Sequence, residues 1–220
     1  METNKFDQII EKIKNDSREK HIPILMDDTL EVIEKNIKNQ IENNIEIKDE
    51  NYIYRILEIG TAVGYSASKF INMIGDNVFV DTIERNEEMF NEAEKNIEKL
   101  ELSEKIDIHF GDAKEIVPTI VKKVIESNDE QEKYDMVFID AAKSGYPFYL
   151  TEGLKVLKKK GIIFADNVLY KGYVMSDYNK HKQRTAVRHL REFIDLATNN
   201  EELDTEILEV GDGLAIIKFK

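Results

Sequence analysis

Hydrophobic positions recur along the chain at two spacings, and each spacing predicts a different kind of element. Near the N-terminus, Phe6, Ile9, Ile10 and Ile13 fall on one face at the three- and four-residue intervals of a helix. A second helix is expected to begin near Asp28, with Glu31 completing a capping box. We interpret this segment as helical, with an apolar face that packs on a core or on a partner chain.

From Tyr52 onward, short apolar runs alternate with longer amphipathic stretches. The apolar runs predict strands over residues 54–60, 77–84, 106–112, 134–140, 161–169, 205–210 and 214–220. A helical stretch follows the first strand, and further helices are expected over 86–100, 113–127, 146–160 and 184–200. Such alternation is typical of right-handed βαβ units around a mostly parallel sheet. The last two strands flank a Gly-Asp-Gly turn at 211–213, which predicts a hairpin and therefore one antiparallel strand.

Composition narrows the class of protein. With 220 residues, 41% hydrophobic and 34% charged, the chain suits a single globular α/β domain over residues 1–220, with 1–45 as a helical extension. No apolar run approaches the ~20 residues that span a bilayer, and a secretion signal is lacking, so we expect a cytoplasmic protein without a membrane partner. The absence of cysteine excludes disulfides, zinc-thiolate sites and cysteine nucleophiles. A net charge of −13 disfavours non-specific nucleic-acid binding, although a local basic patch could still dock a folded RNA.

Polar groups follow the carboxyl ends of the predicted strands, where parallel sheets bind their ligands. Glycines spaced G-x-x-x-G over residues 60–64 allow close approach of the backbone to a ligand, or simply make a tight turn. Ser66 lies near the next helix N-terminus, which favours a carboxylate. Glu84 either accepts the two hydroxyls of a ribose or places a charge at a helix N-terminus, and Asp112 either reads an adenine edge or caps a helix. The pattern predicts a pocket for an adenosyl group with a charged tail, without distinguishing a methyl donor from another nucleoside.

The next two strands end in groups suited to a metal ion. Asp140 ends the fourth strand and Asp166-Asn167 the fifth, and adjacent strands lie about 4.8 Å apart. Clustered carboxylates repel unless a proton or cation intervenes, and all-oxygen ligands select magnesium, calcium or manganese. Alternatively, the two acids cap separate loops. Lys143 is either a base whose pKa is lowered by a metal and a sulfonium, or a surface lysine paired with acids. The four histidines show no metal-ligand spacing, and we interpret them as structural or surface residues.

The segments LEIGTAVGYSAS, TIERNEEMF, FGDA, YDMVFIDAAKSGY, FADNVLYKGYV and VGDGLAIIK occur in this order. From about His21 to the C-terminus, the chain resembles the metal-dependent O-methyltransferases that include the caffeoyl-CoA and catechol enzymes. It is most similar to a bacterial branch, the tRNA 5-hydroxyuridine methyltransferases. Plant caffeoyl-CoA enzymes typically read F-V-D-A-D-K-x-N-Y where this chain reads FIDAAKSGY. The bacterial branch typically reads F-I-D-A-A-K-G-Q-Y, from which Ser144 and Gly145 depart.

The resemblance implies a seven-stranded class I methyltransferase fold, S-adenosylmethionine as methyl donor and frequent homodimerisation. It implies metal ligation by Asp140, Asp166 and Asn167, and a catalytic role for Lys143 beside Asp140. It also implies donor contacts at Leu25, Glu58, Gly60, Ser66, Glu84, Ala113 and Asp140.

One basic segment bears on the substrate. Residues 179–191 contain no Asp or Glu and carry Lys180, Lys182, Arg184, Arg188 and Arg191. This basic strip is either a phosphate-docking surface for the anticodon region of a tRNA or a solvated helix face. From the resemblance and this strip together, we predict a magnesium-dependent enzyme that methylates 5-hydroxyuridine in tRNA to 5-methoxyuridine. The target base would have to be unstacked to reach the pocket. The alternatives are a small-molecule catechol or phenol O-methyltransferase and a non-catalytic adenosyl-binding interaction protein.

Overall fold

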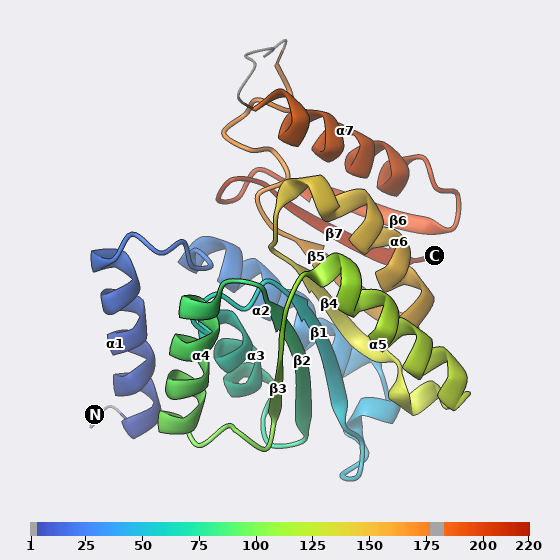
Figure 1. The fold of residues 1–220 in the computed structure, drawn as a ribbon. Coiled ribbons are helices and arrows are strands. Elements are labelled where there is room, and N and C mark those ends of the chain that lie inside the picture. Colours follow the sequence, from blue (N-terminus) through green and yellow to red (C-terminus); the bar gives the residue numbers. More distant parts are fainter. Residues whose placement is uncertain (1–3, 177–182) are drawn as a thin grey trace. The chain divides into compact units, whose positions relative to one another are not determined.

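A computed structural model describes residues 4–176 and 183–220 (Figure 1). Its α-helices are α1 (Lys5–Glu19), α2 (Asp27–Asn43), α3 (Tyr65–Ile74), α4 (Glu87–Lys99), α5 (Ala113–Ser127), α6 (Tyr146–Val156) and α7 (Arg184–Thr198). Its strands are β1 (Tyr54–Ile59), β2 (Val78–Glu84), β3 (Ile106–Phe110), β4 (Tyr134–Ile139), β5 (Leu157–Ala165), β6 (Leu203–Leu208) and β7 (Leu214–Phe219). Short 3-10 turns occur at Glu46–Lys48, Glu130–Glu132 and Lys143–Gly145. No helix in the described ranges is long and apolar enough to cross a membrane.

The strands form one seven-stranded sheet in the order β3-β2-β1-β4-β5-β7-β6. The β2–β3, β1–β4 and β4–β5 pairs are parallel, whereas β7 runs antiparallel to both β5 and β6. The predicted mostly parallel sheet with a C-terminal antiparallel hairpin is therefore confirmed. The chain folds as two compact units, one comprising the chain up to Tyr54 with Gly60–Ala113, the other Arg55–Ile59 with Lys114–Lys220. The expectation of one domain with an N-terminal helical extension stays a prediction.

In the first unit, the apolar stripes of the sequence become buried helix faces. Ile10 and Ile13 of α1 and Ile33 and Ile37 of α2 are buried. The α3 helix packs against α1, α2 and β2, and α4 packs against β2 and β3 (Figure 1). The predicted capping box at Asp28 is wrong, because α2 begins one residue earlier and no side chain caps it. Asp28 lies instead within the first turn, where a carboxylate complements the positive end of the helix dipole.

In the second unit, β4 is buried along its whole length, and α6 packs against β4, β5 and α7 (Figure 1). The helix predicted to extend to residue 160 ends at Val156, and β5 begins at Leu157. The β4–β5 register shifts after the Leu157–Tyr134 pair, so the lysine-rich segment 158–160 forms a bulge. Gly161 permits this bulge, because a Cβ atom there would lie 2.6 Å from Leu157 Cδ1.

Candidate functional site

In the first unit, the glycine loop is tied to the end of β2. The amide groups of Gly60 and Thr61 both donate to the carbonyl oxygen of Ile83 at 3.1 Å. Gly60 has φ 110° and Gly64, the N-cap of α3, has φ 79°, a left-handed conformation that favours glycine. Ser66 follows in the first turn of α3 and is buried. The loop is therefore a tight turn that depends on glycine at both positions, and Thr61, Val63 and Gly64 within it are buried.

Glu84 contacts this loop through one carboxylate oxygen and the N-cap of α4 through the other. Oε2 accepts the amide hydrogen of Ala62 at 2.8 Å, and Oε1 accepts that of Asn86 at 2.8 Å. The N-cap of α4 is Asn86, whose side chain accepts from the amide of Met89, so Glu84 is not the capping group. Each carboxylate oxygen has a further lone pair, which leaves Glu84 able to accept from ribose hydroxyls.

The other predicted donor contacts are distributed over both units. In the first unit, Leu25 is buried just before α2, and Asp112 is exposed immediately before Ala113, the first residue of α5. In the second unit, Glu58 is fully buried in β1, and Asp140 is partly exposed. The donor-binding roles of these residues stay predictions.

In the second unit, the parallel register places the predicted metal ligands at one edge of the sheet. Ile139 pairs with Ala165, so Asp140 and Asp166 follow on neighbouring strands. The amide of Asp166 donates to the carbonyl oxygen of Ile139 at 3.0 Å. The β5 strand ends at Ala165 instead of reaching residue 169, and Asn167 has a left-handed φ of 58° that turns the chain. Its amide donates to Asp166 Oδ1 at 2.8 Å, which fixes that carboxylate.

Lys143 lies among these oxygens. Its Nζ is 3.4 Å from Asp140 Oδ1, 3.2 Å from Asn167 Oδ1 and 3.3 Å from the carbonyl oxygen of Asp166. It also donates to Tyr146 Oη at 2.5 Å. The Lys143 side chain is only 14% exposed, so it is not a surface lysine. The structure thus brings together Asp140, Lys143, Asp166 and Asn167, as the sequence predicted.

Burial controls the protonation of this cluster. Asp166 is 2% exposed, and its burial, reinforced by the nearby Asp140 carboxylate, raises its pKa from 3.8 to about 7. Burial also lowers the pKa of Lys143, against the opposing attraction of Asp140 and Asp166. The lowered pKa that the sequence predicted for Lys143 therefore arises in the protein without a metal or a donor, and burial is its main cause.

The donor set fits a hard divalent cation. Two carboxylates and one amide oxygen are all oxygen ligands of the kind that magnesium, manganese and calcium take. Oxygens of Asp140 and Asn167 converge on a single ammonium nitrogen, which shows that their potential favours positive charge at that point. Burial is the main cause of the raised pKa of Asp166 and the Asp140 carboxylate adds to it, so this buried acid favours keeping its proton.

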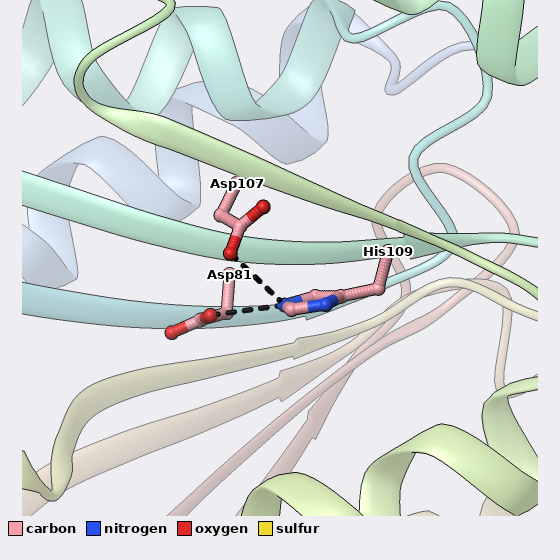
Figure 2. A group of neighbouring side chains, drawn as sticks. All are labelled: Asp81, Asp107 and His109. Atoms are coloured by element: carbon pink, nitrogen blue, oxygen red, sulfur yellow. Dashed lines mark hydrogen bonds and ion pairs between the residues drawn. The ribbon is translucent and has the colours of Figure 1, made fainter.

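A second group of potential ligands lies in the first unit, on β2 and β3 (Figure 2). Asp81 and Asp107 are ladder partners, and His109 follows two residues later on the same face. His109 Nε2 is 3.0 Å from Asp81 Oδ1 and 3.8 Å from Asp107 Oδ2. Among the described residues, this is the one group of three or more His, Cys, Asp or Glu side chains close enough to hold a metal. The sequence analysis looked for metal-ligand spacing among the histidines alone and so did not predict this group. The Asp-x-His pattern on one strand could have indicated it.

The sequence reasoning also missed Tyr146 and Asp212. Tyr146 is fully buried beneath Lys143, and Asp212 acts electrostatically on both Lys143 and Asp166. The carbonyl oxygen of Asp212 accepts the amide hydrogens of Leu169 and Tyr170 at 2.9 and 3.2 Å. The glycine-rich hairpin turn therefore supports the segment that follows Asn167.

The basic strip is divided by the structure. Lys180 and Lys182 lie outside the described residues. Arg184 and Arg188 are exposed and four residues apart on α7, hence on one face. Arg191 donates to the carbonyl oxygens of Val174 at 3.0 Å, Tyr173 at 3.4 Å and Ser176. Its guanidinium therefore holds the backbone of residues 173–176, a structural role that the charge pattern did not indicate.

Comparison with known proteins gives consistent similarities. A model of the O-methyltransferase family matches residues 45–220. A catechol O-methyltransferase of Niastella koreensis is 31% identical over 170 residues, 74% of this chain and 73% of that protein. A caffeoyl-CoA O-methyltransferase of Populus kitakamiensis is 28% identical over 167 residues, covering 74% of this chain and 69% of that protein.

A crystal structure from Staphylococcus aureus, assigned as a caffeoyl-CoA O-methyltransferase, has a TM-score of 0.80 and 30% identity over 96% of this chain and 92% of that one. The Bacillus cereus O-methyltransferase in complex with SAH has a TM-score of 0.78 at 24% identity, covering 97% and 91%. The predicted class I methyltransferase fold is thereby confirmed.

Proposed function

Because the chain belongs to the O-methyltransferase family and is an S-adenosylmethionine-dependent enzyme of that family, we propose that it methylates one hydroxyl of a vicinal oxygen pair on a small catechol-type substrate. A divalent cation, Mg²⁺ in the first instance and Mn²⁺ or Ca²⁺ otherwise, is held by Asp140, Asp166 and Asn167. The observation that carries the proposal is the convergence of Asp140 and Asn167 oxygens within 3.4 Å of Lys143 Nζ.

The protein's own groups have distinct tasks in this reaction. When bound, the cation supplies Lewis-acid activation of the substrate hydroxyl, and S-adenosylmethionine supplies the methyl group. Lys143, whose pKa burial lowers, accepts the hydroxyl proton in its neutral form or stabilises the oxyanion in its charged form. Glu84 and the glycine loop hold the adenosyl group of the donor. The rest of the catalysis is alignment of the oxyanion with the methyl group.

The test measures transfer of labelled methyl groups to a panel of dihydroxyphenyl compounds, with Mg²⁺ and with a chelator. We expect turnover that chelation abolishes, and a loss of at least roughly 100-fold in Asp166→Asn and Asn167→Ala. His109→Gln is the matched control, because it alters the other group of potential metal ligands (Figure 2). Full rates in chelator for folded Asp166→Asn and Asn167→Ala would refute the metal assignment. Donor binding without transfer to any acceptor would favour the non-catalytic alternative.

A second candidate function is methylation of 5-hydroxyuridine in tRNA, favoured by the exposed Arg184–Arg188 pair. The 5-hydroxyl and 4-carbonyl oxygens of that base are vicinal, as in a catechol. Bulk tRNA from a strain lacking the gene would then gain 5-methoxyuridine, with an affinity that falls steeply with salt. The Arg184→Ala/Arg188→Ala variant should lose this activity, whereas Lys38→Ala/Lys122→Ala, which removes two other exposed charges, should keep it. Equal tRNA methylation by both double variants would show that Arg184 and Arg188 do not bind the RNA.

We further propose a homodimer, which the resemblance implies, and a cytoplasmic location, which the absence of cysteine fits. Light scattering at micromolar concentration distinguishes a dimer of the 25.6 kDa chain from a monomer. Cell fractionation with a specific antibody tests the compartment.

A further inference from the structure

We propose that Tyr146 is a positioning residue, whose buried hydroxyl holds the Lys143 ammonium at the reacting end of the site. The inference rests on the proposed function in that it assigns Lys143 a part in methyl transfer. Tyr146 touches Lys143 and the backbone rather than a substrate, so it acts through the lysine.

The Tyr146 hydroxyl joins Lys143 to the ends of two strands. Its oxygen accepts a hydrogen bond from Lys143 Nζ at 2.5 Å. Its proton is directed to the carbonyl oxygen of Asp166 at 2.8 Å, with the carbonyl oxygen of Ile139 at 3.3 Å as the longer alternative. Ile139 ends β4 and Asp166 follows β5, so the hydroxyl connects the lysine to the carboxyl ends of both strands.

The phenol ring is itself fixed in place. Tyr146 has no exposed surface, and its ring meets that of Phe193 on α7 edge-on, with centroids 5.6 Å apart. Lys143 Nζ lies 4.5 Å from the centre of the Tyr146 ring, a cation–π contact in addition to the hydrogen bond. Gly145, between them in the chain, leaves room for the Tyr149 ring, which a Cβ atom there would overlap.

The other Lys143 contacts cannot replace this one. They measure 3.2–3.4 Å, longer than the usual charge-assisted hydrogen bond of about 2.7–2.9 Å. A lysine side chain also has four rotatable bonds to restrain. Removing the hydroxyl in Tyr146→Phe keeps the ring and its packing but frees the ammonium, and misplacement by about 1 Å can cost about 100-fold in rate.

The experiment compares Tyr146→Phe with Tyr134→Phe, a buried tyrosine at the opposite end of β4 that carries Arg55 over its ring. We expect kcat to fall about 10- to 100-fold in Tyr146→Phe, with the KM for S-adenosylmethionine within about twofold and wild-type values in Tyr134→Phe. In a Lys143→Ala background, Tyr146→Phe should have no further effect, since the lysine it positions is gone. Independent, additive losses in the double variant would overturn the inference.

A readout without turnover separates this inference from the proposed function. The rate at which an amine-reactive label modifies Lys143, followed by mass spectrometry, should rise several-fold in Tyr146→Phe and stay unchanged in Tyr134→Phe. If the wild-type enzyme transfers no methyl group but the labelling rate rises, the function fails and the positioning contact stands. If Lys143 labelling and kcat are both unaltered in Tyr146→Phe, the positioning contact fails while the function stands.

Discussion

The buried acid Asp166 makes a prediction about stability that can be worked through from its pKa. In the metal-free protein this pKa is about 7, against 3.8 for an ordinary aspartate. Between these values the folded state holds a proton that the unfolded state has released. The unfolding free energy therefore falls as pH rises from about 4 to 7 and is constant above. A difference of about three pH units corresponds to about 4 kcal/mol of destabilisation at pH 8.

The perturbation is Asp166→Asn, which keeps the shape and the acceptor for the Asn167 amide but cannot ionise. In chelator at pH 8, we expect the variant to be more stable than the wild type by up to about 4 kcal/mol, and by little at pH 4. With Mg²⁺ the gap should narrow, because a ligand of the folded state stabilises only the chain that binds it, and it should close at about 1,000 times the Kd, where binding contributes about 4 kcal/mol.

Urea unfolding at pH 4 and pH 8, with and without Mg²⁺, measures the difference between the two chains and so cancels every other titrating group. A variant that is no more stable than the wild type at pH 8 in chelator would refute the argument from burial. If the variant is more stable than the wild type at pH 8 and Mg²⁺ leaves this difference unchanged, the argument from burial holds and metal binding by Asp166 is refuted.

Three further changes test other parts of the molecule. Gly64→Ala forces a non-glycine residue to φ 79°, so we expect a loss of about 1–2 kcal/mol in thermal unfolding; an unchanged melting temperature would contradict it. Arg191→Ala removes the bonds to residues 173–176, so it should cost about 1–3 kcal/mol and speed proteolysis of that segment, whereas Arg188→Ala should change neither; equal behaviour of the two would count against the structural role. Glu84→Ala removes the acceptor of the Ala62 amide in the glycine loop and of the Asn86 amide at the α4 N-cap, and should weaken S-adenosylmethionine binding about tenfold by calorimetry; an unaltered Kd would contradict a contact between Glu84 and the donor.

The sheet and most element boundaries could be predicted because the buried face of each helix or strand requires hydrophobic residues at a regular spacing in the sequence. The α5 helix is observed at the predicted residues 113–127, and β4 lies within one residue of its prediction. The boundary errors have local causes that periodicity does not report. The α6 helix ends before a lysine-rich bulge whose form depends on how Leu157 pairs with Tyr134, a contact across strands.

The nearness of Asp140 and Asp166 could be predicted from the strand order alone, because parallel strands end at the same edge of a sheet. Contacts made through tertiary packing could not. Arg191 reads as one more cation in a basic strip, yet its donors are taken by carbonyl groups 15–18 residues earlier. The Asp81–His109 contact likewise depends on the β2–β3 register, which brings together residues 28 positions apart.

The position of Lys143 links these observations to the choice between cations in the site. The Asp140 and Asn167 oxygens that face the ammonium are also oxygens that a divalent ion could use. An ion bound through these oxygens would compete with Lys143 for them, and the two positive charges would repel each other. The Tyr146 hydroxyl is outside this competition, because it offers the lysine an acceptor that is backed by the Asp166 carbonyl group. A cationic lysine beside a metal ion would need such a neutral acceptor, and the Tyr146 hydroxyl is placed to provide it.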